Sequence, residues 1–316
     1  MNGEQEGEQP QMRIMTVSDS PQKNDVAGAA QEFLDDIILN IEQEGIFKSM
    51  GVAPNKTYGL FGKPGTGKTM AISALNNHMN YNLYSKALTG DTDTIGMGDY
   101  DLAVFEYSIG RFGTAYINRG SRTVQRFFDQ CGVIAQYGKK VLVVLDECDA
   151  LLQSRTGGVQ GHSEDRKVLE TIMKNLQILH DTPNMYAVLM SNLPEACDEA
   201  SLRAGRIDKK YKFGLPDVDE RSQAFKLAIN QANRRANYKV VRGQQYGPLS
   251  LGSEGFSYAD IMQTVEEAVR ERATEVALDK TKGIMPASYI TQKRLVSAIS
   301  KHKKAFLKED KKGIGF

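Results

Sequence analysis

Two kinds of hydrophobic pattern alternate along the first two thirds of the chain. From Val26 to Ile41, apolar residues recur at three- and four-residue spacing, which predicts an amphipathic helix. The uninterrupted apolar run at 141–145 is typical of a strand buried on both faces of a parallel sheet. Alternation of such segments predicts the α/β class, with a parallel sheet sandwiched by helices. Strands are expected at 57–61, 141–145 and 186–190, and helices at 26–41, 70–79, 127–135 and 168–179.

The pattern changes after Pro216, where helical spacing continues and little strand signal remains. Further helices are expected at 220–235, 258–278 and 291–307. The first 23 residues are polar and non-periodic, which is typical of a disordered leader. The predicted organisation is a disordered leader over 1–23, a large α/β domain over 24–215, a small helical domain over 216–307 and a basic tail over 308–316.

The charges of the chain nearly balance, with 40 Lys and Arg against 39 Asp and Glu. The net charge of the whole chain therefore does not favour nucleic acid or an anionic membrane as a partner. A local basic patch would not be visible in this total. No apolar run reaches the roughly 18–20 residues that cross a bilayer, and the leader lacks the apolar stretch of a signal peptide. The 3 cysteines and 4 histidines are scattered, so we expect reduced thiols, a cytoplasmic protein and no zinc site.

Residues 62–69, GKPGTGKT, match the pattern G-x-x-x-x-G-K-[ST] between an expected strand and an expected helix. Glycines let successive backbone N–H groups turn inward around phosphates, and the helix that follows adds the positive end of its dipole. The Lys68 ammonium is expected to reach the β- and γ-phosphates, and the Thr69 hydroxyl to bind Mg²⁺. The expected phosphate-loop residues are Gly62, Lys63, Pro64, Gly65, Thr66, Gly67, Lys68, Thr69 and Met70.

An acidic pair follows the apolar run at 141–145. Asp146, at the carboxyl end of a central strand, can hold the magnesium directly or through water. Glu147 can orient and deprotonate the attacking water. Many strands end in acidic turns, so this assignment depends on the phosphate loop beside it. Thr69 and Asp146 are thus the expected metal ligands, and Glu147 is an expected catalytic residue.

Taken together, these motifs resemble the AAA family, the branch of AAA+ ATPases that contains katanin, spastin, proteasomal ATPases and membrane-bound AAA proteases. Residues 62–69 and 145–151, LDECDAL, look like its two nucleotide motifs. Ser191-Asn192 resembles its sensor-1 site, where Asn192 would polarise the water. Residues 255–261, GFSYADI, look like the sensor-2 segment of its lid, where Ala259 lets the backbone approach the nucleotide.

The most diagnostic segment is 198–208, DEASLRAGRID, which resembles the second homology region of the family. The resemblance implies that Arg203 and Arg206 reach into the nucleotide site of a neighbouring subunit, where such arginines contribute about 10³–10⁵ in rate. It also implies ATP as the nucleotide, Mg²⁺ as its metal, a homo-oligomer such as a hexamer, and a P-loop AAA+ fold whose small helical domain is a lid.

Residues 116–128, YINRGSRTVQRFF, resemble the pore loop of the family and the helix after it. Tyr116 and Ile117 would grip a polypeptide in a central channel, since aromatic clamps tolerate many sequences. The pattern departs from the family at Asn118, which usually is Gly, and at Arg119, which usually is acidic. Residues 80–105 are longer than the family resemblance implies, and a loop insertion there could contact a partner or be inert.

The resemblance favours an ATP-driven ring that remodels, disassembles or threads a polypeptide, with specificity set by the leader, the basic tail or an adaptor. Two alternatives stay open. One is a nucleic-acid-linked loader or motor, which the near-neutral charge disfavours. The other is a scaffold whose assembly is controlled by ATP, which the catalytic candidates Glu147, Asn192, Arg203 and Arg206 disfavour.

Overall fold

A computed structural model describes residues 13–17, 21–81, 100–109, 120–149, 163–195, 207–236, 238–281 and 289–312. The side chains of 13, 163–166 and 306–312 are not described. Contacts within the chain group it into two units. The first contains Met1–Lys23, Ala29–Pro64 and Lys68–Phe213, and the second contains Asn24–Gly28, Gly65–Gly67 and Gly214–Phe316.

The first unit is built on a six-stranded sheet with the order β1-β3-β4-β5-β2-β6. The strands are β1 (Arg13–Ile14), β2 (Thr57–Gly62), β3 (Leu102–Ser108), β4 (Lys140–Asp146), β5 (Met185–Ser191) and β6 (Lys209–Phe213). Every neighbouring pair is parallel except β1 with β3. The predicted α/β class with a parallel sheet is therefore confirmed.

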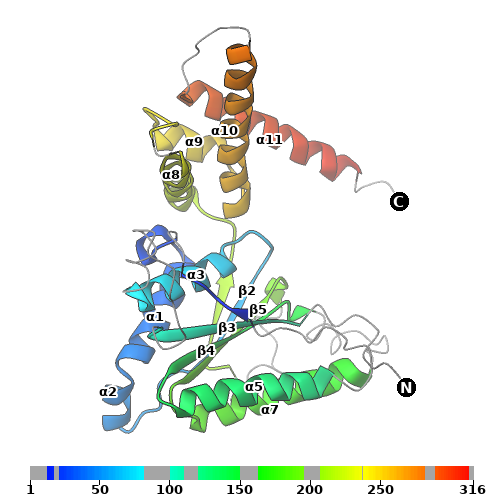
Figure 1. Cartoon of the computed structure of the whole chain (residues 1–316). Helices are drawn as coiled ribbons and strands as arrows, with labels where there is room; N and C mark the ends of the chain where they lie inside the picture. The colour runs from blue at the N-terminus through cyan, green and yellow to red at the C-terminus, as the bar shows by residue number, and fades with distance from the viewer. Residues whose placement is uncertain are drawn as a thin grey trace, which may run out of the picture. The chain divides into compact units, whose positions relative to one another are not determined.

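Helices cover both faces of this sheet. They are α1 (Ala29–Glu42), α2 (Glu44–Ser49), α3 (Lys68–Met79), α5 (Gly120–Gln136) and α7 (Ser163–Asp181). Figure 1 shows α5 and α7 on one face of the sheet, and α1 and α3 on the other. Each face is apolar: Val143 and Leu145 belong to a cluster with residues of α5 and α7, while Phe33 of α1 packs edge-on against Tyr58.

Besides the two-residue β1, two longer strands escaped the sequence-based prediction. β3 carries Glu106 within its apolar stretch, and β6 reads KKYKF, so neither forms an uninterrupted apolar run. β6 lies at the edge of the sheet, where exposed lysines are common because they discourage pairing with other chains. The loop insertion expected at 80–105 is corrected as well, since its last residues, from Leu102, belong to β3.

The leader is more ordered than predicted. Ile14 pairs with Phe105 across β1 and β3, and the Met15 N–H donates to the Val104 carbonyl at 2.8 Å. The Pro21 carbonyl accepts a hydrogen bond of 2.7 Å from Asn77 on α3. The prediction of a disordered leader is therefore wrong for 13–17 and 21–23. A strand of two residues is too short to show the alternating pattern by which strands are predicted.

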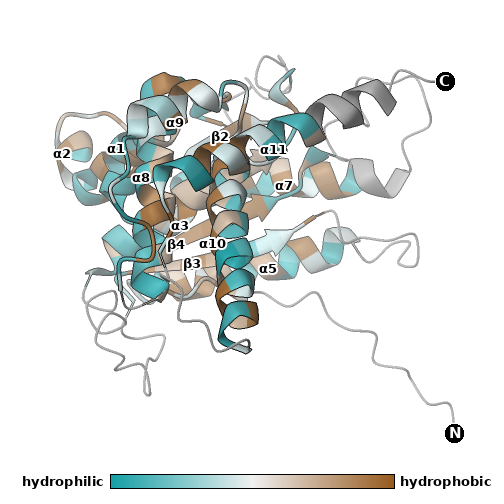
Figure 2. Ribbon diagram, turned by 90° about the horizontal axis from the view of Figure 1, so that it is seen from above, coloured by the Kyte–Doolittle hydropathy of each residue, from teal (hydrophilic) through white to brown (hydrophobic). Residues whose placement is uncertain are grey.

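The second unit is mainly helical, with α8 (Val218–Arg235), α9 (Tyr246–Gly252), α10 (Tyr258–Thr281) and α11 (Gln292–Lys312). Asp217 and Glu220 form a capping box at the start of α8. Figure 2 shows hydrophobic and hydrophilic residues alternating along α10, as its amphipathic packing requires. The buried core includes Phe225, Leu249, Phe256, Ile261 and Leu295. Whether 216–307 is an independent domain stays a prediction.

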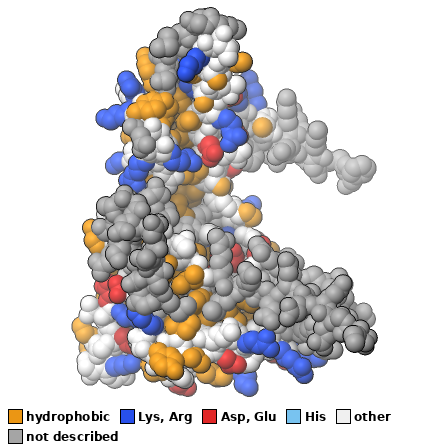
Figure 3. All heavy atoms as spheres, in the orientation of Figure 1, with side chains coloured by type: hydrophobic (Ala, Val, Ile, Leu, Met, Phe, Trp, Pro, Cys, Tyr) orange, Lys and Arg blue, Asp and Glu red, His pale blue; other side chains and the backbone are white. Residues whose placement is uncertain are grey.

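The second unit carries a basic surface that the balanced total charge conceals. On the face in Figure 3 its basic side chains clearly outnumber its acidic ones. Exposed basic residues follow one another around the end of α8, namely Arg234, Arg235, Lys239 and Arg242. A local basic patch of this kind suits a polyanionic ligand such as a nucleic acid.

Asn80 joins the end of α3 to the start of β3 by hydrogen bonds and yields a test of the fold. Its side chain is 1% exposed, and its Oδ1 accepts from the N–H groups of Asp101 (2.8 Å) and Leu102 (3.0 Å). Asn80→Ala leaves buried N–H groups without an acceptor, so we expect unfolding to require less free energy by at least about 1–3 kcal/mol. Urea denaturation measures this loss.

The control is Asn230→Ala, because Asn230 lies exposed on α8. We expect it to change the free energy of unfolding by less than about 0.5 kcal/mol. Equal denaturation midpoints for the two variants and the parent chain would contradict the structural role of Asn80.

Candidate functional site

Three of the predicted motifs meet at one edge of the sheet. β2 ends at Gly62, where the phosphate loop begins, β4 ends at Asp146, and β5 ends at Ser191. These strands are neighbours in the order β4-β5-β2, and all three run parallel. In open parallel sheets, ligands bind outside the carboxyl ends of the strands. The structure thus brings the phosphate loop, the acidic pair and Asn192 to the edge where a ligand is expected.

The phosphate loop has the backbone conformation that its glycines permit. Gly65 and Gly67 have φ angles of 78° and 99°, which side chains other than glycine rarely tolerate. α3 begins directly after the loop at Lys68, so its N-terminal N–H groups point toward the loop. Thr66 is buried, whereas Thr69 is exposed and Met70 lies beside it in the first turn of α3. This geometry can cradle an anion at a helix N-terminus.

Ala259 lies directly against the phosphate loop. Gly65–Gly67 belongs by its contacts to the second unit, and there the Ala259 N–H donates to the Gly65 carbonyl at 3.2 Å. A Cβ added at Gly65 would lie 3.0 Å from the Ala259 Cβ and 2.9 Å from the Ser257 hydroxyl. The small side chain of Ala259 therefore permits its backbone to approach that of Gly65 closely, while the predicted approach of this segment to a nucleotide stays a prediction.

The Lys68 ammonium is held at the centre of the site. Lys68 is 7% exposed, and its Nζ donates to the carbonyls of Gly62 (2.5 Å) and Lys63 (3.1 Å) and to Asn192 Oδ1 (2.9 Å). Burial lowers its pKa, while the nearby Asp146 and Asp149 oppose this shift. A buried cation requires such acceptors, and an incoming phosphate would be a further one.

Asp149 holds Ser191 and Asn192 by hydrogen bonds and was assigned no role from the sequence. Its Oδ1 accepts from the Ser191 hydroxyl (2.7 Å) and the Asn192 N–H (2.6 Å), and its Oδ2 accepts from Asn192 Nδ2 (3.1 Å). The Asn192 amide is therefore fixed so that its oxygen faces Lys68. The only sequence signal was a third carboxylate, three residues after Asp146.

Glu147 has an unusual backbone conformation. Its φ angle is 56°, a left-handed conformation that is uncommon for a residue other than glycine and is enriched at functional sites. The Ser108 hydroxyl donates a hydrogen bond to the Glu147 carboxylate. Ser108 ends β3 and lies opposite Asp146 in the register of β3 and β4. Ser108 is a second residue near the acidic pair that the sequence did not indicate.

Asp146 and Thr69 supply oxygen donors that suit magnesium. Burial raises the pKa of the Asp146 carboxyl, while its Oδ1 accepts the Glu147 N–H at 2.7 Å. Among the described residues, no group of three or more His, Cys, Asp or Glu side chains is arranged to hold a metal. Magnesium does not need such a cage, because it commonly takes one or two carboxylates together with phosphate oxygens and water. The residues present therefore fit this metal.

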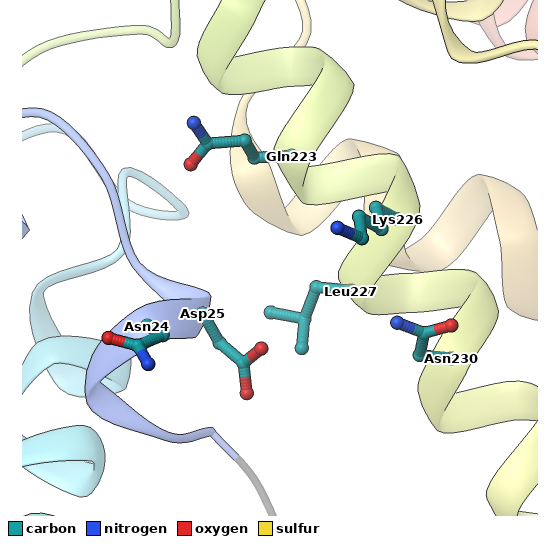
Figure 4. A pocket seen from close by; sticks show the side chains of 6 residues that line it. All are labelled: Asn24, Asp25, Gln223, Lys226, Leu227 and Asn230. Atoms are coloured by element: carbon teal, nitrogen blue, oxygen red, sulfur yellow. The ribbon is translucent and has the colours of Figure 1, made fainter.

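Several predicted site residues lie outside the described residues. They are the pore-loop residues Tyr116, Ile117 and Asn118 and the arginines Arg203 and Arg206. A pocket that the sequence did not predict lies within the second unit, lined by Asn24, Asp25, Gln223, Lys226, Leu227 and Asn230. In Figure 4 the Asp25 carboxylate extends toward the α8 side of this pocket.

The role of Asp149 can be tested by Asp149→Ala. The substitution removes the acceptors of Ser191 and Asn192, so Asn192 loses its fixed orientation. We expect nucleotide hydrolysis to fall on the order of 10²-fold, because small displacements of positioning groups have effects of this size. Nucleotide affinity should change little, since the backbone of the phosphate loop is untouched. Steady-state phosphate release and equilibrium nucleotide binding separate the two quantities.

Asp101→Ala is a matched control, because Asp101 is exposed beside β3 in the same sheet. If Asp149→Ala lost nucleotide binding and hydrolysis to the same extent, the role of Asp149 would be to stabilise the fold and not to orient Asn192.

Comparisons with known proteins agree with this geometry. Residues 58–215 match the model of the ATPase family associated with various cellular activities (AAA). The probable 26S proteasome regulatory subunit 10B of Caenorhabditis elegans is 28% identical over 251 residues, which cover 78% of this chain and 54% of that protein. Proteasome-activating nucleotidases of Saccharolobus islandicus and Thermococcus kodakarensis are 26% and 25% identical, covering 93% and 88% of this chain and 66% and 64% of theirs.

The chain therefore spans between about half and two thirds of the length of these relatives. Among the described residues, no helix has the length and apolar character needed to cross a membrane. The matched region takes up half of the chain and contains the phosphate loop, the acidic pair and Asn192. The chain thus belongs to the AAA family of ATPases.

Proposed function

We propose that this chain is one subunit of a magnesium-dependent, ATP-driven ring, a homo-hexamer, that remodels a polypeptide. The observation that carries the proposal is the meeting of the phosphate loop, the Asp146-Glu147 pair and Asn192 at the carboxyl ends of three neighbouring strands. Relatives named proteasome-activating nucleotidase and 26S proteasome regulatory subunit support a protein as the substrate.

The phosphate loop and α3 bind the triphosphate in this proposal. The Lys68 ammonium exchanges carbonyl acceptors of its own loop for phosphate oxygens, which offer a stronger, charge-assisted interaction. The Thr69 hydroxyl and the Asp146 carboxylate hold Mg²⁺. When bound, this metal neutralises phosphate charge and orients the phosphate oxygens.

Glu147 is the general base for the attacking water, and Asn192 helps to place that water. Asp149 accepts three hydrogen bonds, one from the Ser191 hydroxyl and two from Asn192, and thereby fixes the Asn192 amide. The hydrogen bond from Ser108 restricts the Glu147 carboxylate. The site therefore has a base, a polar positioning group and a cation at the same edge of the sheet, as hydrolysis of a triphosphate requires.

Hydrolysis in this proposal also depends on assembly. Arg203 and Arg206 act in the site of the neighbouring subunit, where their guanidinium groups neutralise charge on the transferred phosphoryl group. Isolated subunits are then nearly inert. Tyr116 and Ile117 of the pore loop, with Asn118 beside them, grip the polypeptide, so each cycle of hydrolysis moves the substrate. An adaptor can recruit that substrate.

Glu147→Gln separates nucleotide binding from hydrolysis. The amide cannot accept the proton of water, so we expect the rate of phosphate release to fall by about 10²–10⁴-fold. ATP binding and ATP-dependent assembly should persist, and native mass spectrometry reads both. Glu254→Gln serves as the control, because Glu254 is exposed in the second unit. A Glu147→Gln protein that keeps its full cellular function would instead support the ATP-controlled scaffold.

Tyr116→Ala tests the polypeptide as substrate. We expect an unfolded protein to stimulate hydrolysis by the parent chain, and this stimulation to be lost in the variant, because the aromatic grip is gone. Nucleotide binding should be unchanged. The matched control is Tyr137→Ala, since Tyr137 is 84% exposed beyond α5.

The same assay with DNA or RNA tests the competing class of function. Stimulation by a nucleic acid that weakens steeply as salt rises, with no response to protein, would point to the basic surface around Arg234 and Arg242 and against the polypeptide.

A further inference from the structure

The basic surface at the end of α8 results from an uneven distribution of ionisable residues. Residues 221–253 contain 6 Lys and Arg side chains and no Asp or Glu. One of them, Arg221, is buried, and its guanidinium donates to the carbonyls of Ser250 (2.9 Å) and Pro216 (2.8 Å). The exposed ones around the end of α8 are Arg234, Arg235, Lys239 and Arg242. The basic surface is therefore formed by a stretch of chain that contributes no carboxylate of its own.

The neighbouring helix α10 packs against α8 and carries several carboxylates. These carboxylates form ion pairs with cations of α10 itself and of α11. The pairs are Glu266 with Arg270, Glu271 with Lys301, and Glu275 with both Arg272 and Arg294. Because other cations engage these carboxylates, the local charge at the end of α8 stays positive.

The chain that returns from α8 is held by hydrogen bonds on both of its sides. On one side, Asn233 Oδ1 accepts from the Val241 N–H (2.9 Å), and Asn233 Nδ2 donates to the Val241 carbonyl (3.3 Å). On the other side, the Ile290 N–H donates to the Val240 carbonyl (2.7 Å), and Val241 forms a parallel bridge with Ile290. Both valines and Ile290 are buried. The exposed basic side chains next to these valines therefore extend from a fixed backbone.

Two exposed tyrosine rings accompany these cations. Tyr238 precedes Lys239 and is 47% exposed, and Tyr289 is 40% exposed. The Arg242 guanidinium lies 5.2 Å from the centre of the Tyr289 ring, and Arg242 Nε donates to the Lys239 carbonyl at 2.8 Å. That bond uses one of the five guanidinium donors, so it orients the planar group without engaging the other four. Oriented cations beside exposed rings are the combination with which proteins bind nucleic-acid strands.

The chemistry of this surface favours a single-stranded nucleic acid over other polyanions. A guanidinium group matches a phosphate, because its planar fork can donate two hydrogen bonds to the phosphate oxygens. The bases of a duplex are stacked on one another, whereas the bases of a single strand can stack on tyrosine rings. An acidic polypeptide would bind the cations but would offer no matching partner for the rings.

We infer that the basic surface, together with Tyr238 and Tyr289, binds a single-stranded nucleic acid, whose phosphates contact the cations and whose bases stack on the rings. Every residue of this surface belongs to the second unit. The inference goes beyond the proposed function and does not depend on it, because it uses no residue assigned to hydrolysis or to the pore loop. A motor that remodels a polypeptide would gain a means of recruitment to polypeptides bound to nucleic acid.

Fluorescence anisotropy of a labelled oligothymidylate with the full chain tests this binding. We expect the logarithm of the association constant to fall linearly with the logarithm of the salt concentration, with a slope of about −0.7 for each phosphate contact. The triple variant Arg235→Gln/Lys239→Gln/Arg242→Gln loses three contacts. Its slope should be shallower by about 2, and its affinity at low salt should be lower by at least about 10-fold. The control Arg270→Gln removes an exposed cation of α10 and should change neither quantity.

Tyr238 separates recognition of bases from attraction between charges. Tyr238→Ala should weaken binding of the single strand on the order of 10–10²-fold and leave the salt slope unchanged, because stacking on a base is not ionic. Tyr238→Phe keeps the ring and should bind like the parent chain. A DNA duplex of the same length should bind more weakly than the single strand. Unchanged nucleotide affinity in every variant shows that the chain still folds.

Three results would overturn the inference. The first is the absence of binding at low salt. The second is binding that Tyr238→Ala leaves unaltered, or for which a duplex or polyglutamate competes as well as the single strand does, since charge alone then attracts the ligand. The third is the loss of protein-stimulated hydrolysis in the triple variant, because the surface would then hold the polypeptide. Persistent stimulation in Tyr116→Ala would contradict the proposed function and leave the binding of nucleic acid intact.

Discussion

The buried ammonium of Lys68 is the constraint around which the site is arranged. A cation that is 7% exposed needs acceptors on several sides, because burial without partners is far more costly than a lost surface hydrogen bond. Two acceptors come from the loop after β2, and the third comes from Asn192 after β5. These groups converge only if β2 and β5 are parallel neighbours, so the sheet order and the chemistry of the site depend on each other.

Elements with a clear local sequence pattern could be predicted from the sequence. Elements that depend on contacts with residues distant in sequence could not. The buried β4 and β5 appear as apolar runs and were predicted correctly, and the continuous motif at 62–69 lies between a strand and a helix as expected. β3 with Glu106 and the edge strand β6 with its lysines depend on pairing partners and were missed. Ser108 and Asp149 act on residues 39 to 43 positions away, and only the register of the sheet reveals such pairs.

The two units are not continuous in sequence, so a prediction that divides the chain at one boundary cannot describe them fully. A boundary near 216 follows from the change in periodicity, yet contacts also place Gly65–Gly67 with the second unit. Glycines permit this, because a Cβ at Gly65 would collide with Ser257 and Ala259. Within the second unit, Gly65 is therefore in direct contact with the start of α10. Gly65 can make this contact because it has no side chain. A pattern of hydrophobic and polar residues gives no information about such a contact.

Two carboxylates of the first unit hold together segments that are distant in sequence. Asp149 and Asp208 each accept several N–H or O–H groups from such segments. Apolar packing could stabilise such junctions equally well, because buried polar groups add little net free energy. Hydrogen bonds are directional, however, so they specify one position of the backbone where packing would allow several.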